Sequence, residues 1–446
     1  MVSFRFATVT EETTMRARAV TDFILGLEFT DIPEQALREA RRCLLDLAGI
    51  AAAGSQTKTG RMLRAFAHGN LGALDGGVRI LMDGRRASPA GAAMAGAAMI
   101  DSVDAHDGYR ETKGHAGVTL LPALAAFADG EAGLDGAEFL TRLVLGYEIA
   151  IRAGLALHAS AADYHTSGAW NALGAAAIGA RRRGLDHEAT RHALGIAEYW
   201  GPRSPMMRVI EHPSMLKDGS AMGAFAGAVA VELAAEGFTG APAATVELDG
   251  GEVWADLGAH WCIAEQYMKP YPVCRWAQPA IQAAMTLRPQ FGEASIETVR
   301  VETFHQGYRL AMRAPADTDQ AQYSLPFPVA AALVHGEVGM AQVDGAGLAD
   351  EAVLKLSHAI ELVEDKSMSA LFPGERVARA TIGLSDGRTL DSGVLAAPGD
   401  PEDPLSDEQL AAIRRPCRPG SWRGKGRRNP RTRCGSRLWL PGRTPA

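Results

Sequence analysis

The sequence has few cysteines and no long apolar run, and these absences exclude several classes of protein. Its 5 cysteines show no C-x-x-C spacing and no even set for a disulfide framework, which indicates a reduced setting. No segment reaches the roughly 18 consecutive apolar residues of a membrane span. Residues 1–14 alternate polar and apolar side chains, unlike a secretion signal. We therefore expect a cytoplasmic protein with no membrane partner.

Motifs for nucleotides, nucleophiles and metals are also missing. The chain has no GxxxxGK[ST] loop, no strand–GxGxxG–helix unit and no GxSxG elbow. It has no HExxH or cysteine-based metal spacing either, and Asp104, His106, Asp107 and His115 are only a weak signal for a metal. We expect no metal and no other cofactor.

Basic residues are scarce outside the C-terminal end. Residues 414–446 hold 11 Lys and Arg and no acid, which leaves 34 basic and 52 acidic residues in 1–413, a formal charge of −18. This charge argues against a nucleic-acid surface on the body, so nucleic-acid binding through the basic tail is the non-enzyme alternative. The tail, 415–446, is rich in Pro and Gly without amphipathic period, which predicts disorder or a non-native end.

Helical periodicity and small residues are abundant. At 446 residues the chain predicts about two domains. Apolar residues recur at helical spacing through most of the first 265 residues, where almost no strand is expected. The expected helices lie within 13–53 and at 61–69, 88–103, 118–128, 136–160, 163–184 (after a polar start), 185–200 and 221–237.

The pattern changes beyond about residue 265. Residues 297–305 alternate, and 377–384 with 389–394 flank an Asp-Gly turn, which predicts a hairpin. Helices are expected between them at 327–334 and 350–362. The fold class is therefore mainly α with a smaller α+β domain. We expect an all-helical domain over 1–265, rejoined by about 396–414, and the α+β domain over 266–395.

Three polar loops each lead into a helix of small residues. The first, Ser102–Val118, carries Asp104 and His115, the second carries His165, and the third carries Lys217. A polar loop between core helices is costly to hold without a function. The repetition predicts one helical core with these loops gathered at one end.

These positions suit acid–base chemistry without a cofactor. A helix N-terminus favours the neutral imidazole of His115 and His165, and it would lower the pKa of Lys217. Lys269 lies in a proline-stiffened segment with Arg275 nearby. Lysines, histidines and arginines near helix N-termini would together bind a small polyanion.

Each residue also has a simpler interpretation. A single His before a helix is more often a cap or a surface group, and Lys269 alone would be a solvated loop lysine. Arg152 with Tyr147 and Glu148 fits an internal salt-bridge set. Only the threefold repetition favours the functional interpretation.

The chain resembles the MmgE/PrpD family from about Thr13 to Gln409. The motifs that carry the resemblance are R-C-L-L-D-L-A-G from Arg42, D-A-H-D-G-Y-R…G-H-A-G from Asp104, G-Y-E-I-A from Gly146, Tyr164-His165, P-S-M-L-K from Pro213, K-P-Y-P-V-C-R-W from Lys269, Y-S-L-P-F-P-V-A from Tyr323 and G-D-P-E-D-P-L-S from Gly399. The family includes 2-methylcitrate dehydratase, cis-aconitate decarboxylase and iminodisuccinate epimerase. The resemblance implies an all-helical domain with an α+β lid, a homodimer, and cofactor-free chemistry at carbons beside carboxylates.

Residue by residue, the resemblance places the family's acid and first histidine on Asp104 and His115. Its second histidine falls on His165 and its two lysines on Lys217 and Lys269. We expect these five residues to be catalytic. The expected substrate contacts are Arg275, Arg110, Tyr109, Tyr147 and His212.

Two departures bear on the reaction. Phe327 stands where decarboxylase-like members carry a tyrosine, and Gly108 where they carry a threonine, with one extra residue before His115. The missing hydroxyls favour an epimerase of the iminodisuccinate type acting on a small di- or tricarboxylate. A lyase like 2-methylcitrate dehydratase or cis-aconitate decarboxylase is the alternative.

Overall fold

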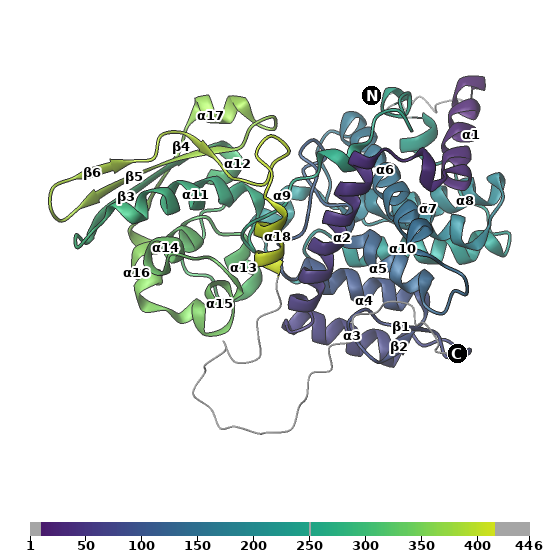
Figure 1. The fold of residues 1–446 in the computed structure, drawn as a ribbon, viewed down its shortest axis with the longest axis horizontal. Coiled ribbons are helices and arrows are strands. Elements are labelled where there is room, and N and C mark those ends of the chain that lie inside the picture. The colour runs from purple at the N-terminus through teal and green to yellow at the C-terminus, as the bar shows by residue number, and fades with distance from the viewer. Residues whose placement is uncertain (1–9, 249–250, 415–446) are drawn as a thin grey trace, which may run out of the picture.

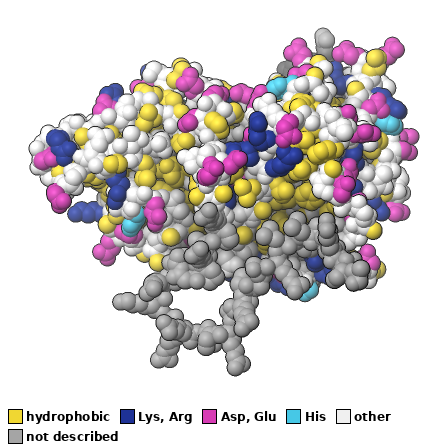
Figure 2. Space-filling model, in the orientation of Figure 1, with side chains coloured by type: hydrophobic (Ala, Val, Ile, Leu, Met, Phe, Trp, Pro, Cys, Tyr) yellow, Lys and Arg dark blue, Asp and Glu magenta, His cyan; other side chains and the backbone are white. Residues whose placement is uncertain are grey.

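The structure is a computed structural model that describes residues 10–248 and 251–414. A helical region and a smaller α+β region lie side by side, with the last helix, α18, drawn between them (Figure 1). The basic tail predicted over 415–446 lies outside the described residues. On the face shown in Figure 2, Lys and Arg side chains are scattered among Asp and Glu rather than gathered in one field.

Ten helices of the described chain, α1 to α10, precede the α+β region, and all of them except the short α9 contribute buried residues to the helical core. They are α1 (Glu11–Gly26), α2 (Glu34–Gly54), α3 (Lys58–Asn70), α4 (Pro89–Asp101), α5 (Gly117–Ala128), α6 (Gly136–Ser160), α7 (Gly168–Arg183), α8 (His187–Trp200), α9 (Met206–Glu211) and α10 (Ser220–Ala235). Short turns of helix follow at η2 (Ala244–Leu248), η3 (Gly251–Trp254) and η4 (Cys262–Glu265), and η1 (Phe29–Asp31) joins α1 to α2. The strands described before residue 265 are β1 (Val78–Arg79) and β2 (Arg86–Ala87), so the expectation of almost no strand is confirmed.

Small side chains set the spacing of the central helices. Helix α7 packs against both α6 and α10, and all three are rich in Ala and Gly. A Cβ on Gly227 of α10 would lie 2.4 Å from the Ala172 carbonyl oxygen of α7. Glycine is therefore required at this crossing, and the close approach buries nearly all of α7.

The α+β region holds a five-stranded sheet and short helices. Its strands are β3 (Ile296–Thr303), β4 (Glu361–Glu364), β5 (Val377–Leu384), β6 (Thr389–Asp391) and β7 (Leu395–Ala396). Its helices are η5 (Arg275–Ala277), α11 (Gln278–Leu287), η6 (Arg288–Gln290), α12 (His305–Tyr308), α13 (Thr318–Gln322), α14 (Pro326–His335), α15 (Met340–Val343), η7 (Gly345–Ala349), α16 (Glu351–Ala359) and α17 (Lys366–Leu371). The strand order is β4-β3-β5-β6, with β7 also paired to β5.

The strand register matches the alternation in the sequence. Val301 of β3 pairs with Ala380 of the antiparallel β5, and both are buried. The predicted hairpin of β5 and β6 is confirmed. The helix expected over 350–362 is too long, because it ends at Ala359 and Glu361–Glu364 instead pairs as β4, parallel to β3. That pairing partner lies about 60 residues away, so local periodicity does not reveal it.

The two regions have separate cores. One core runs from Val20 to Met268 and takes in Leu405 and Leu410, and the other includes residues from Val273 to Leu384. The short helix α9 contributes Met206, among others, to the second core. The predicted fold class is therefore confirmed, while the exact domain bounds stay a prediction.

Helix α18 (Asp407–Arg414) fastens the end of the described chain to the helical region. Arg414 pairs with the buried Asp46 of α2, Nε to Oδ1, at 2.7 Å. Its Nη2 donates to the backbone oxygens of Ala105, at 2.6 Å, and of Lys269, at 2.8 Å. On α2, a Cβ at Gly49 would lie 2.6 Å from the Arg414 Cβ, so only glycine admits this approach.

Candidate active site

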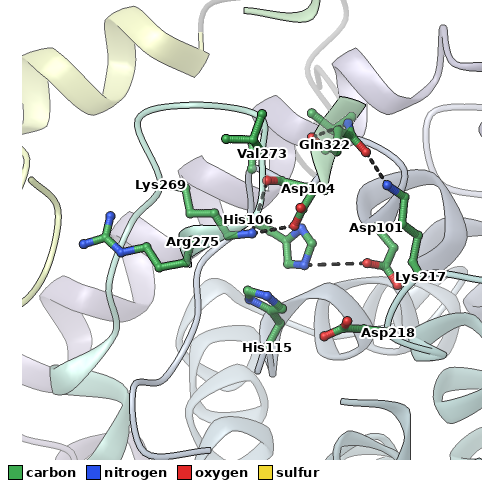
Figure 3. Close-up of polar contacts among 12 residues, drawn as sticks. Asp101, Asp104, His106, His115, Lys217, Asp218, Lys269, Val273, Arg275 and Gln322 are labelled. Carbon is green, nitrogen blue, oxygen red and sulfur yellow. Dashed lines mark hydrogen bonds and ion pairs between the residues drawn. The ribbon is translucent and has the colours of Figure 1, made fainter. Parts of the chain in front are cut away.

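The loop between α4 and α5 brings Asp104 against Lys269. Asp104 has a φ of 51°, in the left-handed region that Asp adopts more readily than most residues. The buried Lys269 ammonium donates to Asp104 Oδ1 at 2.5 Å and to the Asp104 backbone oxygen at 3.1 Å (Figure 3). Burial alone would lower the pKa of Lys269, but the nearby Asp104 carboxylate and Tyr267 outweigh it and raise the pKa. Lys269 is therefore protonated at neutral pH.

His115 lies just before α5 with one ring nitrogen committed. Its Nδ1 is 2.6 Å from the Asp107 carbonyl oxygen, which can only accept, so Nδ1 carries the proton and Nε2 keeps its lone pair. Burial, and then the Lys269 charge, hold the pKa of His115 well below its usual value of 6.5. The imidazole is therefore neutral, in the form that accepts a proton.

The starts of α5, α7 and α10 meet beneath His115. The His115 backbone N–H donates to Ser167 Oγ at 2.9 Å, and that hydroxyl donates to Asp218 Oδ2 at 2.6 Å. Farther along, Thr119 Oγ1 donates to the Ser220 backbone oxygen. Burial raises the pKa of Asp218 to about 6, although the Ser167 hydrogen bond opposes the rise. The loops thus gather at one end of the helical core, as the sequence predicts.

One pocket collects groups from both regions. From the helical region come Asp104, Lys113, His115, Met206, Ile210 and Asp218. The segment after residue 265 supplies Tyr267, Lys269, Cys274, Arg275, Trp276, Tyr323 and Arg376. The cavity between them is about 30 Å³. Of the expected catalytic residues, the structure thus brings Asp104, His115 and Lys269 together.

Lys217 and His165 do not line this pocket, although the Lys217 ammonium lies 5.1 Å from the ring centroid of Tyr323, which does. The Lys217 ammonium contacts Gln322 and pairs with Asp319 Oδ1 at 3.0 Å, and it is not among the lining groups. His165 is half-buried, and its backbone N–H donates to His158 Nε2 at 3.0 Å. The loop before α7 therefore reaches the site through Ser167 rather than His165. Catalytic roles for Lys217 and His165 stay predictions.

Among the expected substrate contacts, only Arg275 lines the pocket. The Tyr147 hydroxyl donates to buried Asp107 Oδ2 at 2.7 Å, and the Tyr109 hydroxyl donates to Glu265 at 2.7 Å. Arg110 pairs with Glu402, while His212 is exposed. The roles predicted for these four residues have no support from the pocket geometry.

The two pocket arginines differ in what they already bind. Arg275 pairs with Asp400 at 2.9 Å and donates to the backbone oxygens of Ala397 and Pro398. Figure 3 shows its guanidinium pointing away from Lys269 and His115. Arg376 donates only through Nη2, to the Arg110 backbone oxygen at 2.9 Å, while its buried Nε and Nη1 have no hydrogen-bond partner among the described residues.

Several residues in or beside the pocket could not be nominated from the sequence. Asp218 adjoins Lys217, and Tyr323 opens a motif that carries the family resemblance, so both had a nearby signal. Ser167 and Arg376 had none, because each reaches the site through tertiary packing. His106 is expected from the sequence only as a weak metal-ligand candidate. Both of its buried ring nitrogens lack a hydrogen-bond partner among the described residues, and Nε2 lies 3.8 Å from Asp101 Oδ1.

One cluster has the geometry for a metal ion. Asp104, His106 and His115 each offer a ligand atom, and these atoms lie within 4.8 Å of one another. Two imidazoles and a carboxylate are a common transition-metal set. However, the Lys269 ammonium is 2.5 Å from Asp104 Oδ1, so a divalent cation there would meet a positive charge at short range. Lys269 already serves as the counter-ion of that carboxylate.

A neutral buried base beside a protonated buried amine, in a pocket between a helical and an α+β region, is typical of an acid–base enzyme. The model of the MmgE/PrpD N-terminal domain matches residues 18–258, and that of the C-terminal domain matches 271–412. The chain belongs to the MmgE/PrpD family, as its motifs predict. The family supports an enzyme of lyase or isomerase type.

A curated relative points to the same family. The cis-aconitate decarboxylase-like protein oryM of Aspergillus oryzae (strain ATCC 42149 / RIB 40) is 24% identical over 436 residues, covering 87% of each chain. Among the described residues, no helix is long and apolar enough to cross a membrane. A cytoplasmic location stays a prediction.

Proposed function

We propose that the protein removes a proton from the carbon beside a carboxylate of a small di- or tricarboxylate, without a cofactor. The observation that carries the proposal is the pairing of His115 and Lys269 in one pocket. His115 has a free Nε2 and a lowered pKa, and Lys269 is protonated beside Asp104. These are the states that a general base and an electrostatic partner need before the reaction starts.

The charge states of His115 and Lys269 assign a role to each. Removing the proton leaves negative charge on the substrate carboxylate as an enolate, and a buried ammonium stabilises that charge more strongly than water would. His115 accepts the proton at Nε2 while Nδ1 stays bonded to the Asp107 carbonyl. Lys269 faces the same pocket and carries protons, so it can return one to the carbon.

Our first candidate reaction is epimerisation, of the iminodisuccinate type. Deprotonation by one group and reprotonation by the other inverts the carbon if the two lie on opposite faces of the substrate. His115 comes from the helical region and Lys269 from the segment that leads into the α+β region, so they approach the pocket from different elements. Lys217 and His165 remain candidates for the second proton carrier.

A lyase is the second candidate, and two tyrosines favour it. A Cβ on Gly108 would lie 2.4 Å from the Tyr267 hydroxyl oxygen, so this hydroxyl fills the space that a threonine at 108 would take. Phe327 is buried in the core of the α+β region, while Tyr323, four residues earlier, lines the pocket. Hydroxyls that the sequence lacks at 108 and 327 thus have neighbours that could donate a proton to a leaving group.

The deciding experiment is incubation with a panel of chiral di- and tricarboxylates in D₂O, followed by NMR. Deuterium at the α carbon with loss of optical purity and no alkene identifies an epimerase. A new enoate absorbance identifies a hydro-lyase, and release of CO₂ identifies a decarboxylase. Lys269→Ala is the control, and a panel in which no compound exchanges, eliminates or decarboxylates contradicts the proposal. Light scattering on the same sample tests the homodimer, which we also propose.

A further inference from the structure

We infer that Arg376, which the α+β region brings to the same pocket as His115 and Lys269, is the anchor for a substrate carboxylate. This inference rests on the proposed function and adds a recognition site to it. Arg376 immediately precedes β5, so a rigid strand fixes its backbone. Its side chain lines the pocket together with His115 and Lys269.

The inference rests on the lack of hydrogen-bond acceptors around the guanidinium nitrogens of Arg376. Arg376 is 4% exposed, and among the described residues its guanidinium has no carboxylate within ion-pair distance. Its Nη2 donates to a backbone oxygen, which leaves the buried Nε and Nη1 without an acceptor. A buried guanidinium without an anion is strongly unfavourable, so such a group in a pocket is matched to an incoming anion.

The surroundings of Arg376 leave its unbonded N–H donors available to a ligand. Its guanidinium carbon lies 5.4 Å from the centroid of the Tyr267 ring, which holds the planar group by a cation–π contact without using its N–H donors. Arg275 lies 5.1 Å from the same ring, yet Asp400 already neutralises it. Of these two cations on Tyr267, only Arg376 is therefore left to pair with a ligand.

A planar carboxylate suits these donors better than a point anion. Guanidinium groups bind carboxylates through two parallel N–H···O bonds, and that geometry also fixes the orientation of the bound molecule. With one carboxylate at Arg376, the carbon to be deprotonated must lie within reach of His115 Nε2. The substrate class is thus a compact molecule with a carboxylate remote from the reacting carbon, and binding it joins the two regions of the protein.

The test is a thermal unfolding series on the full chain, with succinate as the probe and sodium chloride at equal ionic strength as the reference. At about 100-fold excess over the dissociation constant, succinate should raise the wild-type Tm by about 3 °C. Arg376→Met should remove that shift and weaken succinate binding about 100-fold. The matched control is Arg379→Met, because Arg379 lies on β5 three residues after Arg376, is half-exposed and pairs with Asp391. This control should keep the full shift.

Two readouts separate recognition from a structural role. Without ligand, Arg376→Met should have a Tm equal to or above the wild type, because it removes an unpaired buried charge. A large fall in that Tm together with a retained succinate shift would overturn the inference. So would an equal shift with inorganic phosphate, which would make the site a general oxyanion site. If succinate binding requires Arg376 but no polycarboxylate reacts, Arg376 is an anion-binding residue and the proposed function is wrong. If a polycarboxylate is turned over and Arg376→Met leaves KM unchanged, the proposed function stands and the role inferred for Arg376 is wrong.

Discussion

The helical region and the α+β region bring different kinds of groups to one pocket. The helical region supplies Asp104, His115 and Asp218, all on loops that precede or follow tightly packed helices. The α+β region supplies Arg275 and Arg376, which are cations that cannot act as bases at neutral pH. In the function proposed above, the base therefore comes from the helical region and the carboxylate anchor from the α+β region. Substrate preference could therefore change through the α+β region while the acid–base groups stay in place.

The largest test of this division is Lys269→Met, because Lys269 follows the helical region in sequence yet pairs with Asp104 within it. We expect turnover to fall about 10³-fold. We also expect about 3–5 kcal/mol less unfolding free energy at pH 7, because Asp104 is left buried without its counter-ion. Exchange in D₂O and urea unfolding measure the two effects. Adding Asp104→Asn should restore most of the stability but none of the turnover, and recovery of both would place Lys269 outside the chemistry.

His115→Gln tests the helical side alone. We expect kcat to fall by about 10²–10⁴-fold with little change in KM, because the base is lost while the α+β region still binds. The pH profile sharpens the test. Since the pKa of His115 is held well below 6.5, the wild-type acid limb should lie below pH 6.5. A limb that persists unchanged in His115→Gln would show that another group is the base.

Asp107→Asn tests the titration of a buried carboxyl near His115; the Asp107 backbone oxygen that contacts His115 Nδ1 is unchanged in this variant. Burial, and then Asp46, raise the pKa of Asp107 from 3.8 to about 7. A carboxyl group whose pKa is higher in the folded than in the unfolded protein contributes stability at pH values below its unfolded-state pKa. That contribution is lost as the pH rises through its folded-state pKa. The unfolding free energy of the wild type should therefore fall by about 2–3 kcal/mol, relative to the variant, between pH 5 and 8. Urea melts at both pH values measure it, and parallel pH dependence of the two proteins would show that Asp107 does not titrate in this range.

The smallest expected effect is at His212, which the sequence nominates as a substrate contact. Its side chain is exposed and does not line the pocket. His212→Ala should change kcat/KM by less than about twofold and leave the Tm unchanged. A loss of tenfold or more in kcat/KM would show that the substrate also depends on residues outside the pocket.

Much of the fold could be predicted from sequence because its signals are local. The bounds of α6, at Gly136–Ser160, follow from periodicity alone, and the hairpin of β5 and β6 follows from its Asp-Gly turn. Strand β4 could not be found in this way, because Glu361–Glu364 gains its conformation by pairing with β3.

The residues of the site also divide into those with a local signal in the sequence and those without one. His115 and Lys269 belong to polar motifs within apolar sequence and could be predicted as functional groups. Arg376 immediately precedes a predicted strand and has no distinguishing sequence signal. It becomes distinctive only when the structure shows that its Nε and Nη1 have no acceptor among the described residues. Ser167 likewise gains its importance from Asp218, 51 residues away. Such partners are products of tertiary packing, which a single sequence does not display.

The hydrogen bonds of Arg414 determine how late in synthesis the pocket can be completed. This residue holds the backbone of Lys269 and of the loop at Ala105 from the far end of the described chain. On the ribosome, the chain up to Lys269 already carries Asp104, His115 and Lys269, while Tyr323, Arg376 and the arginine that fastens two of these segments have yet to be added. The pocket therefore reaches its final form only when residue 414 can dock on α2.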